Sequence, residues 1–184
     1  MMVTFAVLLS VSIGGVNGYI LAKWRFRYDN FIFGLMLFGC FIPFQIVLIP
    51  IARVLGLLDL AGTTSGLVLV HLTYGIPFTT LFFRNFYVSL PDELISAARI
   101  DGAGFWAILL LILLPVSWPI VTVSVIWQFT NVWNDFLFGA SFSGSDGRPL
   151  MVALNNLVNT STGTKAYNVD MAGAMIAALP TISF

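Results

Sequence analysis

The sequence predicts an all-α fold, a bundle of helices that crosses a membrane several times. Of the 184 residues, 59% are hydrophobic and only 9% are charged, whereas a soluble domain usually carries about 25% charged residues. The mean hydropathy is +0.97. Uncharged apolar runs also recur along the chain at the length of about 20 residues that a helix needs to cross a bilayer. A chain with so few charges cannot cover a water-facing surface, and we therefore expect a polytopic membrane protein.

Five apolar runs mark the expected spans. Four are long enough to cross a bilayer and the fifth is still apolar where the sequence stops; they are residues 1–22, 31–52, 60–83, 102–134 and 171–184. The first run has no basic segment before it and no small-residue cleavage site after it, so we do not expect a secretory signal. We expect residues 1–184 to form one domain that is truncated at both ends.

The first span ends in a basic loop. Gly14, Gly15 and Gly18 allow close contact with a neighbouring helix. Lys and Arg accumulate in short loops on the cytoplasmic side, and this rule places the loop after the first span inside. The same orientation leaves five basic residues inside and three outside: Lys23, Arg25, Arg27, Arg84 and Arg99 against Arg53, Arg148 and Lys165.

The second and third spans contain residues that interrupt their apolar character. Pro43 and Pro50 lie in the second span, where neighbouring helices can satisfy the carbonyls that a proline leaves unpaired. His71 lies in the third span. A histidine inside a membrane is either a proton relay or ligand contact, or a satisfied structural group. Because no acidic residue shares its span, we favour the structural interpretation.

Residues 90–104 form a short polar helix on the cytoplasmic side. Ser89 and Asp92 have the spacing of an N-terminal capping box, and Pro91 suits the first helical turn. Gly102 and Gly104 tolerate the positive φ that ends a helix. Isolated helices shorter than about 12 residues are marginal in water. We therefore expect this helix to lean on another surface, such as that of another subunit.

The end of the fourth span combines aromatic and amide side chains. Trp127 and Trp133 lie where an aromatic belt is expected. An aromatic ring beside amide and carboxylate groups is the chemistry that holds a sugar, and an ordinary interfacial helix end has the same composition. The candidates for contact with a substrate are Gln128, Asn131, Asn134 and Asp135.

No motif for catalysis occurs in the sequence. It contains no phosphate-binding loop of the GxxxxGK[ST] kind, no HExxH and no GxSxG. Cys40 is the single cysteine, so we expect no disulfide within the chain and no cysteine-rich metal site. No basic stripe indicates a nucleic acid. We expect no enzymatic activity and no bound metal, and any ATP must be hydrolysed by another chain.

Four segments resemble the permeases of binding-protein-dependent ABC transporters. AARIDGA (97–103), with Pro115 fourteen residues after Asp101 and Pro119 four further on, resembles the EAA motif of this family. NGYILAKWRF (17–26), WNDF (133–136) and NVDMAGAMIAALP (168–180) resemble its carbohydrate-uptake branch, in the subunit similar to the second permease of the maltose transporter. Within that branch the segments LNNLVNTSTGTKAYNVDM (154–171) and LFFRNFYVSLP (81–91) look most like permeases for glucose or mannose. One departure is Ser96, which stands where the motif has its leading Glu.

The resemblance implies a type I ABC importer permease of which five of six spans are present, in the cytoplasmic membrane of a bacterium or archaeon. It implies that residues 90–104 hold the coupling helix, which docks on an ATP-binding subunit. The motif positions that would carry this role are Glu93, Ala97, Ala98, Asp101, Gly102 and Ala103. The implied partners are a second permease, two ATP-binding subunits that hold ATP and magnesium, and an extracytoplasmic sugar-binding protein.

Two other classes of function remain open. A secondary transporter needs coupling-ion carboxylates within its spans and usually an internal repeat. The charge-free spans argue against it, although Asp135 lies near a membrane end. A non-catalytic structural membrane subunit is the third possibility.

Overall fold

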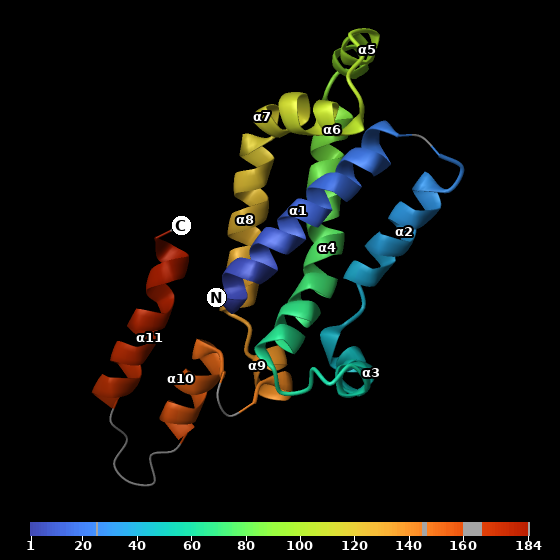
Figure 1. Cartoon of the computed structure of the whole chain (residues 1–184). Coiled ribbons are helices and arrows are strands. Elements are labelled where there is room, and N and C mark those ends of the chain that lie inside the picture. Colours follow the sequence, from blue (N-terminus) through green and yellow to red (C-terminus); the bar gives the residue numbers. More distant parts are fainter. Residues whose placement is uncertain (25, 145–146, 160–166, 184) are drawn as a thin grey trace. The chain divides into compact units, whose positions relative to one another are not determined.

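The computed structural model describes residues 1–24, 26–144, 147–159 and 167–183. Within these residues all regular structure is helical, apart from one isolated bridge between Gly62 and Ser143, which confirms the all-α prediction. The helical elements are labelled in Figure 1, with the exception of η1. They are α1 (Met2–Lys23), α2 (Asp29–Cys40), α3 (Phe44–Leu57), α4 (Thr64–Ser89), α5 (Asp92–Ile100), α6 (Phe105–Ala107), the π-helical η1 (Ile108–Leu113), α7 (Leu114–Val116), α8 (Trp118–Trp133), α9 (Leu137–Phe142), α10 (Leu150–Asn159) and α11 (Tyr167–Ile182). Arg25 and Lys165, which count toward the orientation, lie outside the described residues, as does Phe184.

Two of the expected spans form single long helices. By length and composition, α1 and α4 can each cross a membrane. Helix α11 has 16 described residues, which at 1.5 Å per residue is about 24 Å against a hydrocarbon core of about 30 Å. The described part of the fifth expected span is therefore short for a crossing.

The expectation of one continuous helix over residues 31–52 is wrong. Helix α2 ends at Cys40, and α3 begins at Phe44 with Pro43 as its N-cap in an extended conformation (φ −60°, ψ 130°). A proline has no N–H for a helical hydrogen bond and disfavours the α conformation in the residue before it. Together the two helices have the length and composition of one membrane span, but they are bent by 102° at this break.

The expected span over residues 102–134 is also divided. The segment Phe105–Val116 and helix α8 meet at an angle of 80°. Within that segment the Leu114 N–H bonds to the carbonyl of Leu109, five residues earlier, as in a π-helix. A π-turn is wider than an α-turn, which makes room for Pro115, whose ring clashes with the preceding turn of a regular α-helix. With 16 residues, helix α8 is the longer of the two segments of the fourth expected span.

The chain divides into two compact units. Unit 1 consists of Met1–Phe5, Pro43–His71 and Phe129–Phe184, and unit 2 consists of Ala6–Ile42 and Leu72–Gln128. Helices α1, α4 and α8 each contribute to both units.

In unit 2, α1 and α4 approach each other through small residues. A Cβ atom on Gly14 would lie 2.2 Å from the Thr79 hydroxyl oxygen, and one on Gly18 would lie 2.8 Å from the backbone nitrogen of Arg84. The Thr79 hydroxyl is 2.9 Å from the carbonyl oxygen of Ser10 and donates to it. The sequence prediction that small residues of the first span allow close helix contact is therefore confirmed.

The core of unit 2 packs α1 and α4 against α5 and η1. Its buried members are Tyr19, Phe83, Tyr87, Ile95, Ala98, Ile108, Leu109 and Leu113. Four elements, α1, α4, α5 and η1, contribute to this cluster, and the short helix α5 is consequently packed on the end of its own unit.

In unit 1, aromatic rings link the ends of several helices. The Phe138 ring packs edge-on against Phe44 of α3 and against His71 of α4, with ring centroids 5.7 Å apart in both pairs. The Trp133 indole N–H donates to the carbonyl oxygen of Ala177 at 2.9 Å, which ties α11 to the end of α8.

Candidate functional site

Helix α5 has a buried face and an exposed face. Ile95 and Ala98 point into the core of unit 2 and are 4% and 7% exposed, whereas Ile100 is 86% exposed. Leu94 is exposed as well. In Figure 1 this helix lies beyond the end of α4. The exposed face therefore offers apolar side chains on a nine-residue helix whose opposite face is already occupied.

The ends of α5 differ in part from the sequence prediction. The predicted capping box is wrong, because α5 has no side-chain cap and the Ser89 hydroxyl donates back to the Phe86 carbonyl of α4 at 2.6 Å. Pro91 is the N-cap rather than a member of the first turn. At the other end Gly102 has φ +82°, as predicted, while Gly104 has φ −80° and does not need a glycine's freedom.

The six predicted coupling residues fall into three environments. Glu93, Ala97, Asp101 and Gly102 are exposed, and Ala103 is half-buried. Ala98 belongs to the core of unit 2. A partner docking on α5 can therefore touch the first four directly, whereas Ala98 is small because its own chain leaves it little room.

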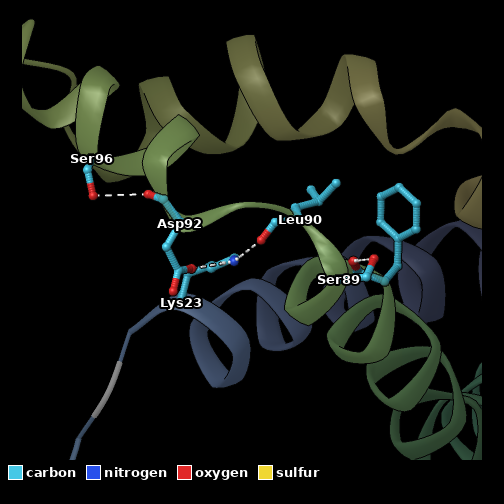
Figure 2. Close-up of polar contacts among 6 residues, drawn as sticks. Lys23, Ser89, Leu90, Asp92 and Ser96 are labelled. Carbon is cyan, nitrogen blue, oxygen red and sulfur yellow. Dashed lines mark hydrogen bonds and ion pairs between the residues drawn. The ribbon is translucent and has the colours of Figure 1, made fainter.

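Ser96, the residue that departs from the motif, turns its side chain back to the helix. Its hydroxyl donates to the Asp92 carbonyl at 3.0 Å, one turn earlier. This bond is drawn in Figure 2. This bond satisfies the hydroxyl within the helix. Because a serine hydroxyl is uncharged, Ser96 places no charge on the exposed face.

The contacts between α5 and the end of α1 were not predicted from the sequence. The Lys23 ammonium donates to the Leu90 carbonyl at 2.7 Å and to Oδ1 of Asp92 at 2.6 Å. The guanidinium carbon of Arg99 lies 4.9 Å from the centroid of the Trp24 ring. Lys23, Trp24, Asp92 and Arg99 are among the residues that line a groove of about 440 Å³ here. In the sequence Lys23 stands out only as an orientation charge, and residues 67 and 69 positions apart share no local pattern that predicts contact.

Gln128 lies in a three-helix contact of unit 2. Its side chain is 2% exposed, and its amide N–H donates to the Ser10 hydroxyl of α1 at 3.1 Å. A Cβ atom on Gly75 of α4 would lie 2.2 Å from the same amide nitrogen. Gln128 thus holds α1, α4 and α8 together, which is the usual role of a buried amide in a membrane bundle.

The other three predicted pathway residues lie in unit 1. Asn131 and Asn134 are exposed. The Asp135 carboxylate accepts the backbone N–H groups of Phe138 and Gly139, at 3.2 and 2.9 Å, at the start of α9. The carboxylate therefore stabilises the beginning of a helix, as an acidic capping group does.

Asp135 also faces His71. The distance from His71 Nε2 to Asp135 Oδ2 is 3.6 Å, and the two side chains are 6% and 13% exposed. From the sequence we favoured a structural role for His71 because its own span holds no acidic residue. The acidic partner comes instead from the turn after α8, so the two groups meet only in the folded chain.

Among the described residues, no three His, Cys, Asp or Glu side chains gather as a metal-binding group. The candidate functional residues belong to two groups. One is the exposed face of a short helix outside the spans, and the other is a set of polar side chains on or beside α8.

The described residues thus form a helical fold with candidate membrane spans and a short exposed helix after one of them. Residues 14–184 match the family described as the inner membrane component of binding-protein-dependent transport systems, and the chain belongs to this family. It is accordingly a multi-pass protein of the cytoplasmic membrane, in a family of non-catalytic membrane components.

Relatives occur in archaea and bacteria. The chain is 44% identical over 167 residues to a probable ABC transporter permease of Pyrococcus horikoshii, covering 90% of this chain and 60% of that protein. It is 34% identical over 197 residues to the xylose/arabinose import permease of Haloferax volcanii, covering 96% of this chain and 64% of the relative. The chain thus spans somewhat less than two thirds of the length of these curated relatives.

The fold has a counterpart of known structure. A crystal structure of a bacterial ABC transporter involved in the import of the acidic polysaccharide alginate matches with a TM-score of 0.80. The match covers 98% of this chain and 68% of the other, at 21% sequence identity. The likeness shows that the chain has the fold of an ABC importer permease.

Proposed function

We propose that the chain is the permease subunit of an ATP-driven sugar importer and that α5 is its coupling helix. The observation that carries the proposal is the two-faced packing of α5. Its buried face, Ile95 and Ala98, fixes the helix to its own unit, while Ala97 and Ile100 are exposed on a helix that no other described element covers on that side. Such a helix transmits force between a partner and the spans.

The partners in this proposal come from the family description and from the resemblance. A binding-protein-dependent system has a binding protein, and the resemblance implies that it is extracytoplasmic and adds a second permease and two ATP-binding subunits. ATP and magnesium are held by the ATP-binding subunits. The loop that contains α5 lies on their side of the membrane, in the cytoplasm. Within unit 2 the two loops that the charge rule places inside do meet, because Lys23 contacts Asp92.

A sugar is the substrate class that the relatives favour. The Haloferax volcanii relative imports xylose and arabinose, and the resemblance of this sequence to glucose and mannose permeases narrows the proposal to a monosaccharide. Asn131 and Asn134 are our first candidates for contact with the substrate, since both are exposed near the end of α8. Gln128 and Asp135 are second candidates, because their side chains already hold parts of the chain in place.

The test is uptake by the complete natural chain, reconstituted in liposomes with its partner subunits and binding protein. Labelled D-glucose, D-mannose, D-xylose and L-arabinose are the probes, each with and without Mg-ATP inside the liposomes. We expect uptake of at least one sugar only with ATP. Uptake that follows an ion gradient and ignores ATP would instead establish a secondary transporter.

The role of α5 is tested by Ala97→Trp in the same system. A bulky exposed side chain blocks docking, so we expect ATP hydrolysis stimulated by the binding protein to fall by about tenfold or more, a loss of about 1.4 kcal/mol in coupling. The control is Ala97→Ser, which keeps the size of the side chain. Unchanged stimulation in Ala97→Trp contradicts the assignment of α5.

A further inference from the structure

We propose that Lys23, the last residue of α1, and Trp24, which follows it, are positioning residues that fasten the coupling helix α5 to α1, so that the two helices move as one body. The proposal rests on the proposed function of α5. It adds a role for two residues that lie outside the EAA segment and that the family resemblance leaves without one.

Lys23 fixes the corner at which the chain turns from α4 into α5. Its ammonium donates to the Leu90 carbonyl and to the Asp92 carboxylate, at 2.7 and 2.6 Å. These two acceptors stand on either side of Pro91, the N-cap of α5. Figure 2 shows the Lys23 side chain reaching both of them from the end of α1. One side chain thereby bridges the whole junction between the two helices.

Trp24 holds the opposite end of the same helix. Arg99, in the last turn of α5, lies over the Trp24 ring at 4.9 Å, a cation–π contact. The ring itself is held by two other aromatic residues, Tyr19 at a centroid distance of 6.4 Å and Phe105 at 5.5 Å. Adjacent residues at the end of α1 therefore contact the first and the last turn of α5.

The connection by which the chain leaves α5 contains a glycine in an open turn. The chain leaves α5 through Gly102, which has φ +82°, and a Cβ atom added to this glycine would meet no heavy atom within 4 Å. A glycine in an open turn absorbs changes in backbone angle easily. A displacement of α5 is therefore passed on through its side-chain contacts with α1 and through the buried residues Ile95 and Ala98.

The two partners of the ion pair are buried to different degrees, so the positioning role of Lys23 can be tested separately from an effect on stability. The Lys23 side chain is 4% exposed and that of Asp92 is 78% exposed. Removing the lysine charge leaves a carboxylate that water already solvates, so no unpaired charge remains buried. We therefore expect a Lys23 variant to assemble normally and to lose the link between α5 and α1.

The experiment compares Lys23→Met with Lys23→Arg in the reconstituted complex, using the sugar from the panel above that the unsubstituted protein takes up best. We expect Lys23→Met to lower the number of sugar molecules imported per ATP hydrolysed by about fivefold, the lower end of the range for energetic coupling between sites. Lys23→Arg, which keeps a cationic donor, should retain most of the ratio. Arg27→Met is the matched control, because it removes the same charge from the same loop at an exposed residue.

A second measurement reports on α5 without transport. A nitroxide is attached at Ala97→Cys in the complete chain with Cys40→Ser, and its mobility in liposomes is read from the electron paramagnetic resonance line shape. We expect higher mobility with Lys23→Met and no change with Arg27→Met. A purely structural role predicts less assembled complex at an unchanged ratio of sugar to ATP.

The two readouts separate this proposal from the proposed function. If the unsubstituted protein imports none of the four sugars, the proposed function fails and the nitroxide mobility still decides whether Lys23 holds α5. Unchanged mobility in Lys23→Met overturns the proposal in every case. Where uptake is measured, an unchanged ratio of sugar to ATP overturns it as well.

Discussion

Ala97 and Ala98 are neighbours in the sequence with opposite surroundings. Ala97 is exposed, and Ala98 is packed among the core residues of unit 2. The motif placed both in one coupling surface. Because Leu94, Ile95 and Ile100 spread apolar side chains around the whole of this short helix, its sequence pattern does not tell the inner face from the outer. Only the folded chain separates the two alanines.

The difference predicts contrasting effects on stability. Ala98→Trp forces a large ring into a packed core, and we expect it to destabilise the protein by about 3 kcal/mol, the upper part of the usual range for overpacking. Ala97→Trp should change stability by less than about 0.5 kcal/mol, as exposed substitutions usually do. Thermal unfolding of both variants in detergent micelles measures the difference. Equal unfolding temperatures would place Ala98 on the surface.

The contact between His71 and Asp135 is a second feature that the sequence alone does not predict. Each is singled out by its chemistry, because charged or titratable groups are rare in this chain. Their meeting at 3.6 Å depends on the turn after α8, which brings the Asp135 carboxylate to the start of α9 and toward α4. A pattern within one span cannot predict a contact between two segments so far apart in the sequence.

Among the helices, close packing was predictable and the breaks were not. The small residues of α1 predicted the contact with α4 that the structure shows at Gly14 and Gly18. Prolines gave a weaker signal. Pro77 and Pro180 lie inside continuous helices, whereas Pro43 begins one. Whether a proline breaks a helix depends on the neighbours that satisfy the freed carbonyls, and these are fixed by tertiary packing.

Because α1 and α4 pack closely, we expect that one added methyl group at their contact destabilises the protein. In Gly18→Ala the new Cβ would lie 2.8 Å from the Arg84 backbone nitrogen and 2.5 Å from the Phe83 Cβ. Backbone atoms cannot move aside as a side chain does, so we expect a loss of about 2 kcal/mol. The control is Gly34→Ala in α2, where no heavy atom lies within 4 Å.

Thermal unfolding in one detergent compares the two alanine variants. We expect Gly34→Ala to be neutral or slightly stabilising, because alanine favours a helix over glycine by about 1 kcal/mol. A Gly18→Ala variant as stable as Gly34→Ala would mean that α1 and α4 do not approach each other as closely as the structure shows.

At the scale of the whole molecule, exposed apolar side chains belong to two kinds of surface. Val123 of α8 is 52% exposed and Ile100 of α5 is 86% exposed. The proposed function places Val123 inside the bilayer, where it faces lipid or a partner helix, and Ile100 in a loop outside it. The composition, in which apolar residues predominate, predicts a membrane protein. It does not separate lipid-facing from partner-facing side chains, because both surfaces are apolar.

An arginine at each position separates these environments. We expect Val123→Arg to lower membrane insertion, since an arginine near the centre of a span costs about 3 kcal/mol. Ile100→Arg should insert as the unsubstituted chain does. The measurement is the fraction of protein that resists alkaline extraction from the membrane. Equal resistance of the two variants would mean that α8 does not cross the hydrocarbon region at Val123.

The contacts of Lys23 also set an order of events during synthesis. Leu90 follows Lys23 by 67 residues, and at a translation rate of about 5 to 20 residues per second the ribosome needs about 3 to 13 s to make that length. During this interval neither acceptor of the lysine exists, and by the charge rule we expect Lys23, Arg25 and Arg27 together to favour the cytoplasmic side for this part of the chain. The acceptors of Lys23 arrive only after α4 has been made. On this expectation the same ammonium group is first one of several charges that orient the nascent chain and later the partner of α5 in the finished protein.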